Sequence, residues 1–195
     1  MREDAIEAIH DFWFGELDAD GLTHSDRSSL WFKADPATDA ACRRRFGTDL
    51  ARARSGELAH WSDSDRGLVA LVVLLDQFSR NIHRGTPQAF AADARALALS
   101  RTCIDTARDT RLPAIHRVFM YLPLEHCEDL ATQRECVALF SGLADAHPGT
   151  ADFLRFAIAH REVIEQFGRF PHRNAILGRP STAAELEYLE THRGF

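Results

Sequence analysis

Apolar residues recur along most of the chain at the spacing of an amphipathic α-helix. Ile6, Ile9 and Trp13 begin this pattern, which puts apolar side chains on one helix face. No stretch alternates apolar and polar residues for long enough to indicate a β-strand. The pattern predicts an all-α fold of antiparallel helix pairs, with an up-and-down bundle as the alternative. We expect helices at residues 3–14, 26–32, 36–56, 62–84, 87–108, 113–122, 124–130, 132–146, 150–167 and 182–192.

Several of these helices have recognisable start signals. Asp35-Pro36 and Thr86-Pro87 each place a capping residue before a proline at the first helical position. Residues 62–65 and 182–185 have capping-box spacing, a serine or threonine three residues before an acid. Pro123 is expected to interrupt its helix, because proline lacks an amide donor and clashes with the preceding turn.

The apolar run at residues 68–75 leads directly into a dense group of polar side chains. A helix that is apolar on every side is buried, so its last turns must carry polar groups out of the core. Asp76, Arg80 and His83 share one face, and Asn81 lies on the neighbouring face. They could form an intrahelical ion pair and a helix end. Their density also suits a binding site, because buried polar groups need partners.

Two further polar clusters accompany other expected helices. The first begins with His116, Arg117 and Tyr121 and continues to residues 125–129, where Glu125 and His126 each share a helix face with Asp129. Glu125, His126 and Asp129 could form an acid–base set or part of a metal site, although acids in a helix's first turn are also common structural features. His160 precedes residues 168–179, which hold three arginines and a histidine among apolar residues. We expect this segment to be fixed to the body of the protein, either as an anion-binding edge or through ion pairs with nearby glutamates.

We expect the three clusters to converge on one polar pocket. The arginines would hold an anionic group and the histidines would supply hydrogen bonds. The candidate ligand-binding residues are Asp76, Arg80, Asn81, His83, His116, Arg117, Glu125, His160, Arg169, His172 and Arg173.

Composition narrows the possible partners and location. The net charge of -6 argues against nucleic-acid binding, which needs a basic face. The 195 residues contain no linker-like stretch, so we expect a single domain. No apolar run reaches the roughly 18 residues of a membrane-spanning helix. The charged first residues do not resemble a signal peptide, and the four cysteines form no CxxC pair, so we expect a cytoplasmic protein with reduced thiols.

Four motifs carry a resemblance to a known family. They are DFWFG at residues 11–15, LDQFSRNIHRGT at 75–86, YLPLEH at 121–126 and FGRFPHRN at 167–174. Together they are similar to the bacterial family known as domain of unknown function 924. The resemblance covers the chain from about residue 11 onward. It implies an all-α, right-handed superhelix like those of tetratricopeptide repeats, and it implies no activity.

Three functional hypotheses remain open at this point. The leading one is a pocket that binds an anionic small molecule or a peptide end. The second is a hydrolase or lyase that uses a carboxylate–histidine pair in the same pocket. The third is a scaffold for a protein partner or a homodimer, in which the polar clusters are structural. No phosphate-loop, dinucleotide or zinc motif is present, so we expect no cofactor and no metal ion.

Overall fold

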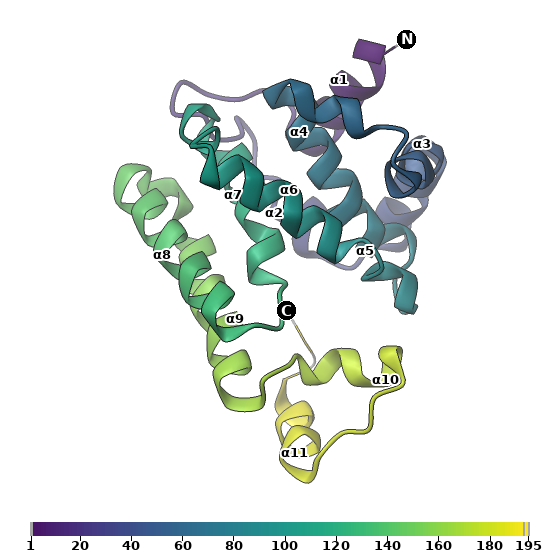
Figure 1. Cartoon of the computed structure of the whole chain (residues 1–195), viewed down its shortest axis with the longest axis vertical. Coiled ribbons are helices and arrows are strands. Elements are labelled where there is room, and N and C mark those ends of the chain that lie inside the picture. The colour runs from purple at the N-terminus through teal and green to yellow at the C-terminus, as the bar shows by residue number, and fades with distance from the viewer. Residues whose placement is uncertain (1, 193, 195) are drawn as a thin grey trace.

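A computed structural model of the chain describes residues 2–192 and 194, and these residues are helical with short connections (Figure 1). Within them, the β-structure consists of one isolated antiparallel bridge between Leu17 and Thr23. The α-helices are α1 (Arg2–Trp13), α2 (Ser28–Phe32), α3 (Pro36–Ser55), α4 (Asp65–Val72), α5 (Ser79–Ile82), α6 (Asp93–Asp105), α7 (Ala114–Glu125), α8 (Leu130–Ala146), α9 (Ala151–Phe167), α10 (Asn174–Leu177) and α11 (Ala183–Thr191). The other helical turns are η1 (Ala59–Asp63), η2 (Val73–Phe78), η3 (Pro87–Ala89), η4 (Asp109–Arg111), η5 (Pro148–Thr150) and η6 (Pro171–Arg173).

The predicted buried helix lies at the centre of the core. Segments α4, η2 and α5 follow one another without a break, and every residue from 67 to 79 is buried. They pack against α1, α3, α6 and α7. Phe78 stacks on Phe46 with ring centroids 4.7 Å apart and contacts Trp13 edge to face. Each such apolar side chain contributes about 1.5–3 kcal/mol when it leaves water.

The middle of this buried helix is a π-helical turn, η2, which the sequence pattern does not predict. A π turn pairs each amide with the carbonyl five residues earlier, and such turns are frequent at functional sites. Asp76 and Gln77 lie within it. The turn therefore sets the direction in which these two side chains leave the helix.

Three predicted helix boundaries are confirmed in atomic detail. The Asp35 carboxylate accepts hydrogen bonds from the amides of Ala37 and Thr38 at the start of α3. Gly56 ends that helix with a φ of 93°, a left-handed conformation that glycine adopts without a Cβ clash. At the start of α11, Thr182 and its third neighbour form the reciprocal hydrogen bonds of a capping box.

The expected start at Ser62 and the expected helix from Pro87 are wrong. Residues 59–63 form η1, so α4 is capped by Ser64, whose Oγ accepts the Gly67 amide at 3.1 Å. The Thr86 hydroxyl donates to the His83 carbonyl at 2.8 Å and does not cap a helix. Only the short turn η3 follows it, and α6 begins at Asp93.

The expected break at Pro123 is also wrong, because α7 continues through it to Glu125. The turn after the proline is completed when the His126 amide donates to the Leu122 carbonyl at 2.9 Å. The expected separate helix at 124–130 is absent for the same reason. Asp129 instead caps α8 by accepting the Thr132 amide.

The last part of the chain is fixed to the body of the protein, as expected. We call residues 168–192 the C-terminal segment; it contains η6, α10 and α11 and lies below the α8–α9 pair in Figure 1. Phe170 is fully buried against Val163 and Ile164 of α9. Arg179 forms a bidentate ion pair with Glu128, with N–O distances of 2.6 and 2.9 Å. Among the described helices, none has the length and apolar character needed to cross a membrane.

Candidate functional site

A cavity of about 300 Å³ lies where α2, η2, α5, α7, α9 and the C-terminal segment meet. Its polar lining residues are Lys33, Gln77, Arg80, Asn81, Arg84, Glu125, His126, His160, His172 and Arg173. Its apolar lining consists of Trp31, Phe32, Ala89, Phe90, Leu122, Phe153, Phe156 and Ile176, together with Gly85. Six of the eleven predicted residues therefore line one cavity, and they come from all three predicted clusters.

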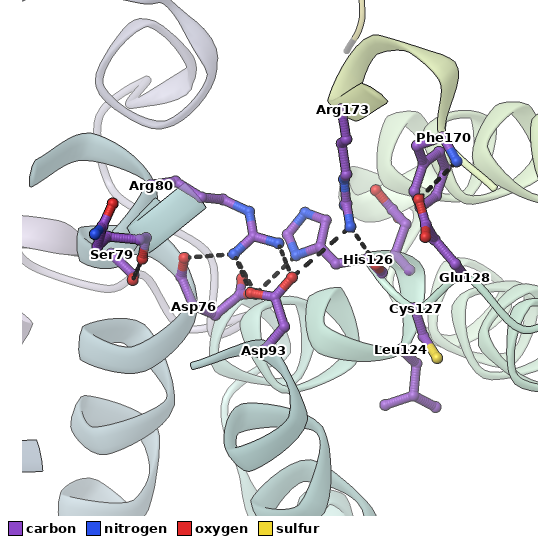
Figure 2. Close-up of polar contacts among 12 residues, drawn as sticks. Asp76, Ser79, Arg80, Asp93, Leu124, His126, Cys127, Glu128, Phe170 and Arg173 are labelled. Atoms are coloured by element: carbon purple, nitrogen blue, oxygen red, sulfur yellow. Dashed lines mark hydrogen bonds and ion pairs between the residues drawn. The ribbon is translucent and has the colours of Figure 1, made fainter. Parts of the chain in front are cut away.

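Asp76 is buried and contacts three of the lining residues, Gln77, Arg80 and His126; Figure 2 shows it beside Arg80. Its Oδ1 is 2.8 Å from Nδ1 of His126 and 3.1 Å from the Arg80 guanidinium. The side-chain amide of Gln77 donates to Oδ2 at 2.6 Å. Burial alone would raise the pKa of Asp76, but Arg80 and His126 outweigh it, so the pKa of this carboxyl is lowered. Asp76 is therefore ionised at neutral pH.

Two arginines from distant parts of the chain point toward Asp93, at the start of α6 (Figure 2). Arg80 donates to both Asp93 oxygens, at 2.9 and 3.0 Å. The Arg173 guanidinium stays 3.8 Å from Asp93 and donates to the His126 carbonyl at 3.0 Å. It lies over the rings of Phe90 and Phe170, at 4.8 and 4.4 Å from their centroids. Burial and the charge of Arg80 lower the pKa of Arg173 to about 10, so it remains cationic.

Glu125 contributes an acidic group to the same cavity. Its side chain is buried, and no described residue hydrogen-bonds to its Oε2. Its Oε1 is 3.2 Å from Nδ1 of His160, which also contacts the Phe156 carbonyl at 2.9 Å. Burial, reinforced by the negative charge of Asp76, raises the pKa of Glu125 to about 8. At neutral pH Glu125 is therefore a neutral acid that can donate a hydrogen bond.

His126 is oriented by its carboxylate neighbour. The ionised Asp76 accepts a hydrogen bond from Nδ1, which makes Nε2 the basic nitrogen of the ring. Burial and the nearby Arg80 lower the pKa of His126, so the ring is neutral at pH 7. Asp76 and Glu125 thus hold opposite protonation states beside two neighbouring imidazoles, His126 and His160, whose ring centroids are 6.2 Å apart. Such a pair of carboxyl groups is suited to acid–base chemistry. No group of three histidine, cysteine or carboxylate side chains among the described residues could hold a metal ion.

The expectation that His83 and His116 would line the pocket is wrong. His83 follows α5 on the side facing α3, and its Nε2 is 3.2 Å from the Arg54 guanidinium. His116 is buried near the start of α7 against the rings of His10 and Phe14, with centroids 4.9 and 4.5 Å away. Burial lowers the pKa of His116 to about 3, so it acts as a neutral core residue.

Arg117 and Arg169 also lie outside the cavity, because each has closer partners. Arg117 donates to the Tyr121 hydroxyl, which itself donates to Asp109 at 2.6 Å. Arg169 forms a bidentate ion pair with Glu185 of α11, with N–O distances of 2.6 and 2.7 Å. Arg117 is thus engaged within α7, and Arg169 is engaged by α11, so neither guanidinium lines the cavity.

The sequence reasoning placed His126 in an acid–base cluster but not among the pocket residues, and it missed the aromatic side chains of the cavity. Phe153 and Phe156 share a face of α9 with His160, and that spacing was a usable signal. Phe32 stacks on Phe156 with centroids 6.2 Å apart, and these two rings are 50% and 49% exposed. Trp31 is held beside them by a hydrogen bond from its indole nitrogen to the Trp13 carbonyl.

Comparison with known proteins finds a family and a solved structure that are similar to this chain. Residues 9–193 match a family described as bacterial protein of unknown function, DUF924. The chain is also similar to a solved structure, the protein of unknown function ATU0120 from Agrobacterium tumefaciens. The two chains are 35% identical with a TM-score of 0.85, over 98% of this chain and 100% of the other. Among curated proteins, none matches the chain.

Proposed function

The chain belongs to the bacterial DUF924 family, and we propose that its cavity binds a small organic anion. One observation carries the proposal. Arg173 is only 6% exposed, lines the cavity, and has its nearest carboxylate oxygen 3.8 Å away. A buried cation is costly unless an anion compensates it closely. A bound anion would supply that compensation.

A small molecule suits the cavity better than a peptide end. The volume of about 300 Å³ is at the lower end of the usual range for small-molecule sites. The lining also has the usual composition of such sites, apolar walls with a few converging polar groups. A peptide carboxylate would share the same chemistry and remains a ligand to be tested.

Thermal-shift measurements test this proposal directly. A panel of small carboxylates and phosphates is added to the wild type, to Arg173→Met and to Arg155→Met, whose side chain is 81% exposed. A ligand of the folded state raises the apparent melting temperature. We expect at least one anion to do so in the wild type and in Arg155→Met but not in Arg173→Met. An equal shift in Arg173→Met, or no shift with any anion, would refute the proposal.

A second candidate function, hydrolase or lyase chemistry, is favoured by the Asp76–His126 pair. This carboxylate–histidine pair would provide the base, and neutral Glu125 would provide the acid. Replacing His126 with alanine should abolish turnover of a bound anion while leaving its binding within a few-fold. Incubating the ligand with the protein in D₂O, followed by NMR, detects exchange or cleavage. Identical spectra with and without protein would argue against catalysis.

The scaffold alternative has less support, because it predicted polar clusters satisfied internally with no cavity between them. Arg80 fits that prediction, since it is fully engaged by Asp76 and Asp93. Arg173 and Glu125 do not fit it. The single-domain organisation, the cytoplasmic location and the tetratricopeptide-like superhelix stay predictions.

A further inference from the structure

We infer that the ligand is a monocarboxylate with an apolar, ring-sized body. This inference rests on the proposed anion site and names its ligand class. It combines two independent features of the cavity: how closely its arginines are paired with carboxylates, and which apolar side chains line it.

The charge of the wall favours a single negative charge on the ligand. Of the three arginines lining the cavity, Arg80 is bound by Asp76 and Asp93, and Arg84 is bound at 2.6 and 2.9 Å by Asp39. Arg173 is the lining arginine, among the described residues, without a carboxylate oxygen within hydrogen-bond distance. Its Nε–H has no hydrogen-bond partner among the described residues, so this one guanidinium can bind one carboxylate, whereas a phosphate dianion would need a second cation.

Lys33 does not add a second buried cation to the cavity. It is exposed at the edge of the cavity, where water screens its charge. The remaining acidic group, Glu125, favours a carboxylate as well. Its proton can be donated to a carboxylate oxygen, and its own pKa is high enough to keep it neutral at pH 7.

The aromatic side chains that line the cavity favour a ligand with an apolar body. Phe32 contacts Phe153 and Phe156 with ring centroids 6.0 and 6.2 Å apart, and Trp31 lies 6.4 Å from Phe153. Half of the Phe32 and Phe156 surfaces is exposed, so a ligand ring could remove further apolar area from water. Acetate or inorganic phosphate would leave that surface uncovered. The same side chains therefore select against small hydrophilic anions.

Calorimetric titration with four probes tests the inference at pH 6.5. The probes are 3-phenylpropionate, its neutral amide, acetate and phenyl phosphate. We expect 3-phenylpropionate to bind about tenfold or more tightly than each of the others, as loss of one charge-assisted contact or one buried ring predicts. Arg173→Met and Phe156→Ala should each weaken its binding about tenfold. Arg155→Met and Leu186→Ala, whose side chains are exposed on other surfaces, should leave it unchanged.

Each alternative outcome has a distinct meaning. Tighter binding of phenyl phosphate, lost in Arg173→Met, would overturn the monocarboxylate inference and leave the anion site standing. Equal affinity for acetate, or full affinity in Phe156→Ala, would overturn the apolar part of the inference. Binding of the amide as tightly as the acid would refute the role of Arg173. If neither the carboxylates nor phenyl phosphate binds, both the inference and the anion site fail.

Discussion

Replacing Glu125 with glutamine should make the protein more stable at neutral and mildly alkaline pH. Burial raises the pKa of Glu125 from 4.5 to about 8 on folding. Below pH 4.5 both the folded and unfolded states hold the proton, so the group does not affect stability. As the pH rises from there to about 8, the unfolded state loses the proton while the folded state keeps it. The wild type therefore loses stability across this interval, by about 1.4 kcal/mol per pH unit.

The size of the effect follows from the same values. The full interval corresponds to about 5 kcal/mol, of which about 3 kcal/mol is lost by pH 7. Glutamine keeps the shape of the side chain and has no proton to lose in this range, so Glu125→Gln should not show the loss. Glu125 is only 3% exposed, so solvent screening does little to reduce the difference.

Urea denaturation followed by circular dichroism, at pH 5, 6, 7 and 8, measures the prediction. The free energy of unfolding of Glu125→Gln minus that of the wild type should grow by about 4 kcal/mol over this range. His160, which contacts Glu125 from α9, and His126, which follows Glu125 in the chain, are present in both proteins, so most of their own titration cancels. Glu162→Gln, at an exposed carboxylate of α9, is the control and should give a nearly constant difference. Parallel pH profiles for Glu125→Gln and the wild type would refute the assigned protonation state.

Three further predictions concern the free energy of unfolding. Asp76→Ala should cost about 3–5 kcal/mol, because it removes a buried carboxylate that Gln77, Arg80 and His126 all contact. The exposed Asp152→Ala should cost less than about 0.5 kcal/mol, and similar losses would contradict the described network. Gly47→Ala should stabilise α3 by about 0.5–1 kcal/mol, because the added Cβ would meet open space. Gly56→Ala should destabilise the protein by about 1–2 kcal/mol, because Gly56 has a φ of 93°. If both substitutions changed the free energy of unfolding in the same direction, the assigned backbone would be contradicted. Thr182→Ala should lower the protection of α11 amides from hydrogen exchange by about 1 kcal/mol, and unchanged exchange would argue against the capping box.

The sequence predicted helices best where the signal was entirely local. A cap at Asp35 or Thr182 depends on residues within one turn, and both formed as predicted. The signal at Thr86 failed because a competing local hydrogen bond to the His83 carbonyl was equally available. The π turn was not predictable, since an apolar run has the same composition in α- and π-helical form.

The site was predictable only in part, for a related reason. The change from apolar to polar residues at Asp76 correctly marked the cavity, because burial requires partners for polar groups. Which polar side chains reach the cavity depends on partners supplied by other helices. Arg169 and Arg173 are four residues apart and look alike in sequence, yet Glu185 binds the first and no carboxylate closely binds the second. That difference is decided by tertiary structure.

The π turn η2 makes the protein tolerant of a one-residue change in length at one place. Such a turn contains about one residue more than an α-helical turn, so deleting any one residue from Val73–Phe78 would restore ordinary helical pairing. The shorter turn would still complete about one revolution, so α5 and Arg80 would keep their direction relative to α4. The extra residue is therefore a local widening that places Asp76 and Gln77 without displacing the helix that follows. Homologous sequences should accept a single-residue gap in this stretch while keeping the rest of the polar site.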